Sequence, residues 1–456
     1  MFSTVKKIHF VGIGGIGMSG IAEILLNQGF DISGSDLNQS ENTDYLEKIG
    51  AKIHIGHSAD NIGNSEVVVY SSAVKPETNP ETAAAAEKKI PILRRAEMLA
   101  EVSRLNYTIA VSGTHGKTTT TSMAGLVLMK SGVDPTVIVG GRLKDLGGTN
   151  ARLGKGEWTV VEADEYDRSF LQLTPTIAVI NNIETEHMDI YRDFADLKDT
   201  FTEFANKVPF YGVVALGLDD PGVKEIFAQI NKKIVTYGLS RHCDIRADSI
   251  RFEGRTARCT VYESEIELGE LAINIPGIHN IKNALAAVTV ARQLGIEFNK
   301  IALALSEFNG VFRRFEIKGE RNGTIVIDDY AHHPTEVKST LKAARRAWKD
   351  RRIICVFQPH TFSRTKALAK EFGMSFDDAD LLVITDIYPA REQPIEGITG
   401  KTLADAALQS GHGNVKYIQD FNTLPFELSN MAKENDVLIT MGAGNIWKIS
   451  DIMVKE

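Results

Sequence analysis

The sequence is poor in cysteine, in long apolar runs and in excess positive charge, and each shortage excludes a class of protein. Its 456 residues include only three cysteines, Cys243, Cys259 and Cys355, which are too few and too scattered for a disulfide framework. No segment approaches the roughly 20 apolar residues that a membrane helix requires. The formal net charge of -8 argues against a protein that binds nucleic acid non-specifically.

These shortages also predict the cellular compartment of the protein and the kind of molecule that it binds. The amino-terminal segment has neither the long apolar region nor the cleavage site of a signal peptide, and scattered thiols are typical of a reducing compartment. We therefore expect a cytoplasmic protein that acts on small molecules, with no nucleic-acid or membrane partner. We expect it to be a monomer or a homodimer.

The length and composition indicate several globular α/β domains. A chain of this length corresponds to about three domains, and 43% hydrophobic with 24% charged residues is normal for a protein with large cores. Apolar strands are expected at 7–12, 107–113 and 324–329, and each ends in glycines or carboxylates before a helical pattern. Such strand ends are where α/β folds bind ligands.

We predict three domains of the α/β class. Residues 1–104 are expected to form a Rossmann-like domain and residues 105–315 a central P-loop domain that binds ATP. Within it, 247–276 alternate in the manner of short strands and predict a small antiparallel sheet at the edge. Residues 316–456 are expected to form a Rossmann-like carboxyl-terminal domain.

The first motif that suggests chemistry is a glycine-rich turn between an expected strand and an expected helix. It contains four glycines followed at a distance by an acidic residue: Gly12, Gly14, Gly15, Gly17 and Asp36. The glycines allow the backbone to approach a diphosphate, and the helix N-terminus favours its charge. A dinucleotide and a UDP-sugar both fit this pattern. We add Ser71, which follows the strand at 67–70, to this binding set.

A second turn has the residues expected for a nucleoside triphosphate. It contains Gly113, Thr114, His115, Gly116, Lys117, Thr118 and Thr119. Lys117 can neutralise the β- and γ-phosphates, and Thr118 can bind Mg²⁺. Val111 stands where the first glycine of the usual Walker sequence is expected. One loop for a diphosphate and one for a triphosphate indicate an enzyme that consumes ATP and acts on a nucleotide-linked substrate.

Acidic residues and one histidine follow two strands of the central domain. Glu162 and Glu165 come after the first of these strands, and His187 comes after the second. Carboxylate oxygens suit Mg²⁺, which also bridges phosphates. We expect one of the two glutamates to complete a magnesium site with Thr118, and His187 to bind a second ion or orient a nucleophile.

Further polar residues stand on a helix of the central domain and at two strand ends of the third. Asn283, on an otherwise small and apolar helix, has an amide that can pair with a base edge. Segments 328–336 and 357–365 each follow a strand, so both are expected at the carboxyl edge of one sheet. Arg364 with a neighbouring histidine suits the carboxylate of a small substrate.

Together these motifs resemble the Mur ligase family over essentially the whole chain. The matching segments are GIGGIGMSGIAEIL at 12–25, SGTHGKTTTT at 112–121, EADEYDRSFL at 162–171, NNIETEHMD at 181–189, GIHNIKNALAA at 277–287, DDYAHHPTE at 328–336 and FQPHTFSRT at 357–365. The phosphate loop is common to the family. The first, sixth and seventh segments are specific to the branch that adds L-alanine to UDP-N-acetylmuramate in peptidoglycan biosynthesis.

The resemblance implies a reaction and a set of site residues. ATP is expected to phosphorylate the carboxylate of the nucleotide sugar, and the amine of L-alanine is expected to attack the acyl phosphate. The implied catalytic residues are Lys117, His187, His332 and Arg364. The implied ligands of Mg²⁺ are Thr118, Glu165 with Glu162 as the competing candidate, and His187. Asn283 is expected to contact adenine, Asp328 to contact ATP, and Tyr330, His332, His360 and Arg364 to surround alanine and the acyl phosphate.

Two other functions are compatible with part of the sequence. An NAD-dependent oxidoreductase would explain the first glycine turn but none of the later motifs. A ligase that recycles a murein tripeptide would use the same nucleotide sugar, but we expect a cysteine among its first glycines, where this chain has Gly14. One departure concerns Thr361, because some alanine-adding members have arginine there; the alanine carboxylate is then expected to rely more on Arg364.

Overall fold

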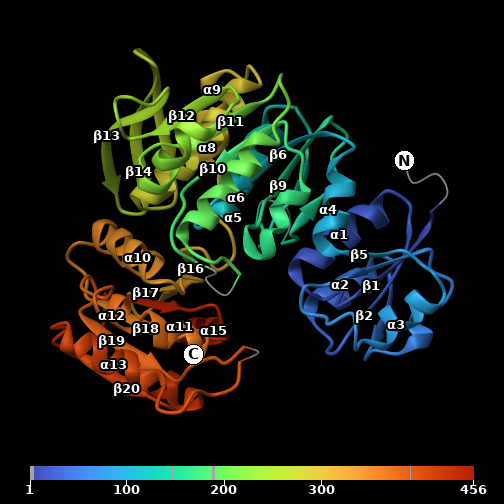
Figure 1. Ribbon diagram of the computed structural model, residues 1–456. Helices are drawn as coiled ribbons and strands as arrows, with labels where there is room; N and C mark the ends of the chain where they lie inside the picture. The colour runs from blue at the N-terminus through green and yellow to red at the C-terminus, as the bar shows by residue number, and fades with distance from the viewer. Residues whose placement is uncertain (1–4, 145–147, 187–189, 391, 456) are drawn as a thin grey trace. The chain divides into compact units, whose positions relative to one another are not determined.

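The structure is a computed structural model that describes all residues except 1–4, 145–147, 187–189, 391 and 456. The chain divides into two compact units. The first comprises Met1–Asp248, Thr260–Leu271 and Lys282–Phe308, and the second comprises Ser249–Cys259, Ala272–Ile281 and Asn309–Glu456. The chain forms three sheets, of five, ten and six strands, and Figure 1 labels their elements. None of the described helices is long and apolar enough to cross a membrane.

The first sheet is parallel and carries the first glycine turn. Its strands are β1 (Lys7–Val11), β2 (Asp31–Asp36), β3 (Lys52–Ile55), β4 (Val67–Tyr70) and β5 (Ile92–Arg94), in the order β3-β2-β1-β4-β5. Its helices are α1 (Ile16–Asn27), α2 (Glu41–Lys48), η1 (Ala59–Ile62), α3 (Pro80–Glu87) and α4 (Arg95–Ser103). The strand order reverses beside β1, so the turn after β1 lies where open α/β sheets bind ligands.

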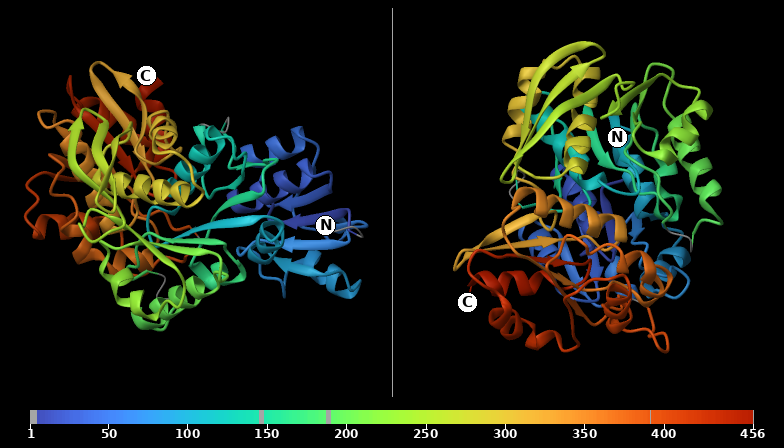
Figure 2. Two further views of the ribbon diagram at one scale, coloured as in Figure 1. Left: turned by 90° about the horizontal axis from the view of Figure 1, so that it is seen from above. Right: turned by 90° about the vertical axis from the view of Figure 1, so that its left-hand side faces the viewer.

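Both faces of this sheet are buried, which explains the continuous apolar runs of its strands. Ile8 and Phe10 belong to a cluster that includes Ile21 of α1. Val11 and Val68 point to the other face and pack in a cluster with Ala85 of α3. Helices accordingly cover both faces, as the blue segment of Figure 2 shows.

The second sheet has a mainly parallel centre and holds the phosphate loop. Its strands are β6 (Tyr107–Ser112), β7 (Thr136–Ile138), β8 (Ala151–Arg152), β9 (Trp158–Glu162), β10 (Ile177–Ile180), β11 (Val213–Gly217), β12 (Ile234–Gly238), β13 (Ile245–Glu253), β14 (Thr256–Glu263) and β15 (Ile266–Ile273). Their order is β15-β14-β13-β12-β11-β10-β6-β9-β7-β8. The edge strands expected at 247–276 are present, but they extend the main sheet, because β12 pairs with β13 through Tyr237 and Ile245.

Helices connect the strands of the second sheet. They are α5 (Lys117–Lys130), η3 (Tyr166–Gln172), α6 (Phe194–Asn206), α7 (Pro221–Ile226), η4 (Phe227–Gln229), α8 (Ile278–Gln293) and α9 (Phe298–Ser306). α5 begins directly after the phosphate loop, and its residues Thr118–Leu128 are all buried. This helix is therefore a central element of the core rather than an amphipathic surface helix.

The third sheet contains the remaining motifs. Its strands are β16 (Glu316–Arg321), β17 (Thr324–Asp329), β18 (Ile353–Phe357), β19 (Leu381–Thr385), β20 (Val415–Ile418) and β21 (Val437–Met441), in the order β16-β17-β21-β18-β19-β20. The helices are α10 (Pro334–Ala347), α11 (Phe362–Ala367), α12 (Ala369–Gly373), α13 (Gly400–Gln409), η5 (Phe421–Thr423), α14 (Leu424–Met431) and α15 (Trp447–Lys455). Only β16 runs antiparallel to its neighbour.

The expected fold class of three α/β domains is therefore confirmed. The two motifs after β17 and β18 lie at the carboxyl edge of one sheet, as expected, because both strands run parallel to β21 between them. The sequence did not indicate that the last strand of the chain separates them. A strand inserted from the far end of the chain leaves no local pattern.

Candidate active site

The turn after β1 is shaped by its glycines. Gly12 has φ +81°, and a Cβ there would lie 3.0 Å from Cβ of Ser71. A Cβ on Gly14 would lie 2.9 Å from Oδ2 of Asp36. α1 starts after Gly15 with no side-chain cap and no acidic residue in its first turn. The positive end of this helix is thus left for an anionic ligand.

The structure brings the predicted residues of the first turn together and adds Arg95. Gly14 N donates to Oδ2 of Asp36 at 2.9 Å, so this carboxylate stabilises the turn itself. Arg95 lies against Gly17, where a Cβ would be 3.1 Å from its Nη1. In the part of the chain that the structure describes, Arg95 has no acidic partner. An unpaired guanidinium beside an uncapped helix N-terminus suits a diphosphate.

The phosphate loop after β6 leaves no room for side chains at its two glycines. Gly113 has φ +133° and Gly116 has φ +80°. A Cβ on Gly116 would lie 2.5 Å from Oδ1 of Asn283, and one on Gly113 would lie 3.0 Å from Cβ of Asn181. The backbone therefore turns sharply into α5 and presents its N–H groups to a phosphate.

Two asparagines after β10 hold the phosphate loop in this shape. Asn182 accepts from His115 N at 2.7 Å and donates to His115 O at 3.1 Å. Asn181 donates to Oγ1 of Thr120 at 3.1 Å and accepts from the buried Tyr237 hydroxyl at 2.7 Å. From the sequence, the segment 181–189 that begins with these asparagines was expected to follow a strand whose end binds ligands. In the structure their side chains bond to the loop.

Asn283, expected at the adenine, lies beside Gly116 of the same loop and bonds to Thr120 of α5. It is 7% exposed, and its Oδ1 accepts from Oγ1 of Thr120 at 3.2 Å. This contact places it under the phosphate loop, near Gly116. Thr114 and Thr119 are also buried here, and His115 lies 3.5 Å from Glu184.

Lys117 is folded back onto the loop and paired with Glu165. Its Nζ lies 2.7 and 2.9 Å from the two carboxylate oxygens of Glu165 and donates to Gly113 O at 2.8 Å. The two side chains are 14% and 1% exposed. Burial alone would lower the pKa of Lys117, yet the carboxylates of Glu165 and Asp164 raise it above its ordinary value. The ammonium therefore stays charged and is held in place for an anionic ligand.

The two candidate magnesium carboxylates have different neighbours. Glu162 accepts from Oγ1 of Thr118 at 3.0 Å and from Gly140 N at 2.7 Å, whereas Glu165 is engaged by Lys117. The oxygens of Thr118 and Glu162 stand together beside the phosphate loop and are the hard donors that Mg²⁺ prefers. This pair fits the ion better than Glu165 does. His187, expected at a second ion, lies outside the described residues.

At the end of β17 two aspartates are buried and satisfied within the second unit. Asp328 accepts from Oγ1 of Thr440 at 2.7 Å and from Nε of Arg313 at 3.0 Å. Asp328 was expected to contact ATP, but both of its oxygens are occupied and its side chain has no exposed surface. It therefore orients Arg313. Burial also raises the pKa of Asp329 to about 6, while this residue accepts from Phe315 N and Ala331 N.

The histidines and aromatic residues of the third sheet form one cluster. The ring of His332 lies 5.2 Å from that of Tyr330 and 5.9 Å from that of His360. His360 also stacks on Tyr388 at 5.9 Å with an interplanar angle of 11°. Arg364 donates through Nη1 to Nδ1 of His360 at 3.3 Å. All four residues predicted around alanine therefore meet at the carboxyl edge of this sheet.

His360 is neutral in this environment. Burial, together with the neighbouring His332 and Arg364, lowers its pKa to about 4. Because a guanidinium only donates, Nδ1 of His360 accepts and the ring proton stands on Nε2. His360 thus offers an N–H donor, and Arg364 offers a charged group whose planar fork fits a carboxylate.

The sequence missed Tyr388 and Arg95. Tyr388 follows β19, and applying the strand-end rule to that strand as well would have found it. Arg95 begins α4, and no local pattern connects it to a glycine turn nearly eighty residues earlier in the sequence. Only the packing of α4 near α1 brings it to Gly17.

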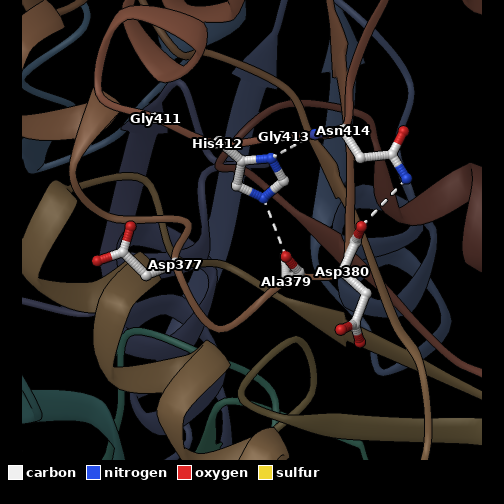
Figure 3. Close-up of a pocket in the computed structure, with 7 residues that line it drawn as sticks. All are labelled: Asp377, Ala379, Asp380, Gly411, His412, Gly413 and Asn414. Atoms are coloured by element: carbon white, nitrogen blue, oxygen red, sulfur yellow. Dashed lines mark hydrogen bonds between the residues drawn. The ribbon is translucent and has the colours of Figure 1, made fainter.

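A shallow pocket of about 250 Å³ lies elsewhere in the third sheet (Figure 3). It is lined by Asp377, Ala379, Asp380, Gly411, His412, Gly413 and Asn414. Asp380 directly precedes β19, so the pocket stands at the amino end of the strands, opposite the edge at which α/β sheets bind ligands. Both ring nitrogens of His412 are already bonded, to Ala379 O and Asn414 N. We therefore do not assign this pocket to the reaction.

Models of the Mur ligase family match three parts of the chain. The Mur ligase family catalytic domain matches residues 7–107, the Mur ligase middle domain matches 111–291, and the Mur ligase glutamate ligase domain matches 313–444. Together these matches cover all three sheets described above.

Individual relatives agree with these matches. The UDP-N-acetylmuramate–L-alanine ligase of Salinibacter ruber is 51% identical over 451 residues, which are 99% of this chain and 95% of the relative. The crystal structure of the UDP-N-acetylmuramate-alanine ligase of Thermotoga maritima superposes with a TM-score of 0.85 at 30% identity, covering 98% of both chains. A murein peptide ligase of Psychrobacter arcticus gives a TM-score of 0.71 at 24% identity over 98% of both chains, which shows a shared fold.

Proposed function

The chain belongs to the Mur ligase family, and from that premise we propose that it joins L-alanine to the carboxylate of UDP-N-acetylmuramate, converting ATP to ADP and phosphate. The observation that carries this proposal is the 51% identity to an alanine-adding ligase along 99% of the chain. ATP dependence is a property of the family. The reaction belongs to peptidoglycan biosynthesis. We assign the protein to the cytoplasm. Its substrates are small molecules.

The chemistry consists of two transfers. A carboxylate oxygen of the sugar attacks the γ-phosphorus of ATP, the bond to the bridging oxygen breaks, and ADP leaves. The alanine amine then attacks the carbonyl carbon of the acyl phosphate, loses a proton, and expels phosphate from the tetrahedral intermediate. A carboxylate alone is a poor acyl donor, so the first transfer creates the leaving group. The protein contributes mainly positioning and charge neutralisation.

The residues of the second sheet are assigned to the phosphoryl group. Lys117 meets the transferring phosphoryl oxygens, after leaving or sharing the contact with Glu165. The backbone N–H groups from Gly113 to Lys117 bind the phosphates. Thr118 and Glu162 would hold Mg²⁺, which when bound neutralises phosphate charge. Of the two glutamates, Glu162 is our choice because it alone stands at the threonine hydroxyl.

The residues of the third sheet are assigned to alanine. Arg364 grips the alanine carboxylate through two parallel hydrogen bonds, and His360 donates from Nε2. Tyr330 and His332 complete this pocket. Asp328 acts indirectly, by holding Arg313 over the ring of Tyr330.

The first glycine turn is assigned to the diphosphate of the nucleotide sugar. Gly12, Gly14, Gly15 and Gly17 supply the close backbone approach, and Arg95 supplies the countercharge. Ser71 borders the turn beside Gly12. Asp36 acts by fixing Gly14.

An ADP-release assay with each candidate amine tests the proposal. We expect ADP to form only when UDP-N-acetylmuramate and L-alanine are both present, and mass spectrometry to show the product with one alanine. Glycine, serine and the murein tripeptide are the comparison substrates. Turnover with the tripeptide but none with free alanine would assign the chain to the recycling ligases instead.

A further inference from the structure

The loops after β18 and β19 continue side by side beyond the ends of their strands. Tyr388 N donates to Pro359 O at 2.9 Å, and Thr361 N donates to Tyr388 O at 3.0 Å. His360 and Tyr388 form an isolated parallel bridge in this way. The two loops therefore act as one extension of the sheet, which carries His360 on one strand end and Tyr388 on the other.

Directly after this bridge the chain turns through a strained residue. Thr361 has φ +68°, a backbone conformation that a β-branched residue rarely adopts. The turn leads into α11, a helix of only six residues that carries Arg364. Strain of this kind persists only where surrounding contacts hold the backbone in place.

Glu392, on the loop after β19, supplies those contacts. Its carboxylate accepts from Ser363 N at 2.9 Å and from the Ser363 hydroxyl. It also accepts from Phe362 N and from the side chain of Thr361. Burial would raise the pKa of Glu392, but these hydrogen bonds lower it below its ordinary value, so the carboxylate that holds the turn is ionised at neutral pH.

The turn that Glu392 holds decides where two pocket residues point. His360 precedes Thr361, and Arg364 follows it by three residues. The guanidinium of Arg364 reaches Nδ1 of His360 across the turn at 3.3 Å. If the turn relaxes, the fork of Arg364 and the ring of His360 no longer have a fixed relative orientation. Bidentate recognition of a carboxylate depends on that orientation.

We propose that Glu392 is a positioning residue that fixes the turn at Thr361–Ser363 and so orients Arg364 and His360 toward the alanine carboxylate. The inference rests on the proposed function, because it assigns these two residues to the amino-acid pocket. Glu392 itself does not touch substrate. It joins the loops after two neighbouring strands, so that one pocket is built from both.

Steady-state kinetics of Glu392→Ala tests the proposal. We expect the KM for alanine to rise by about tenfold to a hundredfold, as for a misplaced binding group. The KM values for ATP and UDP-N-acetylmuramate should stay within about twofold, because the hydrogen bonds described for the Glu392 side chain all go to the turn at residues 361–363. Glu392→Gln should lie between wild type and Glu392→Ala, because its amide oxygen still accepts one hydrogen bond.

Glu396→Ala is the matched control. Glu396 stands on the same loop, is exposed, and should leave all three KM values unchanged. Thermal unfolding of each variant separates loss of the turn from loss of the fold. If Glu392→Ala does not fold, the alanine KM values of Glu392→Gln and Ser363→Ala test the proposal instead, since each variant removes only part of the contact between Glu392 and Ser363.

A double variant shows whether Glu392 affects alanine binding through Arg364 or by a general weakening of the protein. If Glu392 works through Arg364 and His360, then Glu392→Ala should raise the alanine KM by a smaller factor in Arg364→Ala than in the wild type. Losses that multiply in the double variant, an unchanged alanine KM in folded Glu392→Ala, or an equal rise for ATP would overturn the inference. Absence of alanine-dependent ADP release from the wild type would instead refute the proposed function.

Discussion

The two glycine turns of the first unit have the same architecture but supply their charge differently. Each links a parallel strand to a helix N-terminus, after β1 in one case and after β6 in the other. In the second turn the cation is Lys117, the first residue of α5, and it already has a buried carboxylate partner. In the first turn the cation is Arg95, which comes from α4 and has no such partner among the described residues.

Both backbone motifs suit phosphate, and we infer that the surrounding charges determine whether the bound phosphate reacts. A lysine held by Glu165 beside Thr118 and Glu162 suits transfer of a phosphoryl group. A lone guanidinium beside an uncapped helix suits binding of a diphosphate that does not react.

The largest effect is expected at Lys117. Lys117→Ala should lower turnover by on the order of a thousandfold, because it removes a charge that meets the transferring phosphoryl group. Binding of UDP-N-acetylmuramate, measured by calorimetry, should remain, because we assign that ligand to the first turn. Lys117→Ala also removes the charged partner of the buried Glu165 carboxylate. The thermal stability of Lys117→Ala should therefore be compared with that of Glu165→Gln, in which this carboxylate is neutral. Loss of nucleotide-sugar binding by folded Lys117→Ala would contradict separate sites.

The glycines of the two turns should differ in their tolerance of a methyl group. Gly116→Ala should weaken ATP binding by about a hundredfold, since it places a Cβ 2.5 Å from Asn283 at φ +80°. Gly15→Ala should weaken nucleotide-sugar binding less, by about tenfold, because Gly15 has φ -63° and its nearest protein neighbour would be 3.6 Å away, so that the added methyl group meets only the bound diphosphate. Titration of each variant with both ligands checks this contrast. Equal effects would mean that steric fit does not distinguish the turns.

A smaller and selective effect is expected at Arg95. Arg95→Ala should raise the KM for UDP-N-acetylmuramate by about tenfold and leave the KM for ATP unchanged, because a charge-assisted contact to phosphate is lost. Arg94→Ala is the control, since Arg94 is mostly exposed and donates to the Tyr70 hydroxyl instead. A change confined to ATP would place Arg95 outside the diphosphate site.

The helix that begins at the first turn, α1, should make the stability of the protein depend on pH. Glu23 is buried in α1, where it accepts from the Tyr45 hydroxyl at 2.9 Å, and burial raises its pKa from 4.5 to about 7. The folded protein therefore binds more protons than the unfolded chain between these values, so stability falls as pH rises through this window. Glu23→Gln should add about 2 kcal/mol at pH 8 and nothing below pH ~4.

Denaturant unfolding at several pH values measures this effect. Glu47→Gln on the neighbouring α2 is the control, because Glu47 is exposed and should shift stability by less than about 0.5 kcal/mol. A gain for Glu23→Gln that does not depend on pH would show that packing, and not ionisation, is responsible.

Much of the fold and part of the site followed from local patterns. Short apolar runs predicted the strands that lead into the ligand motifs, because strands buried on both faces show no alternation. The resemblance favoured Glu165 over Glu162 as the magnesium ligand, but the sequence could not separate them, since both stand within four residues at the end of β9. The spatial neighbours favour Glu162, because Thr118 lies at its carboxylate and Lys117 lies at that of Glu165.

The sequence by itself determined which chemistry the chain carries, because glycine turns, a helix-starting lysine and strand-end carboxylates act through local backbone geometry. Which of these side chains also bond to distant residues became clear only from the tertiary structure. Asp36, Asp328 and Asn283 were predicted to contact ligands, and in the structure their oxygens also accept hydrogen bonds from Gly14, Arg313 and Thr120. Arg95 and Glu392 were not predicted at all. A hydrogen bond between distant segments depends on how strands and helices pack, and no spacing along the chain records that.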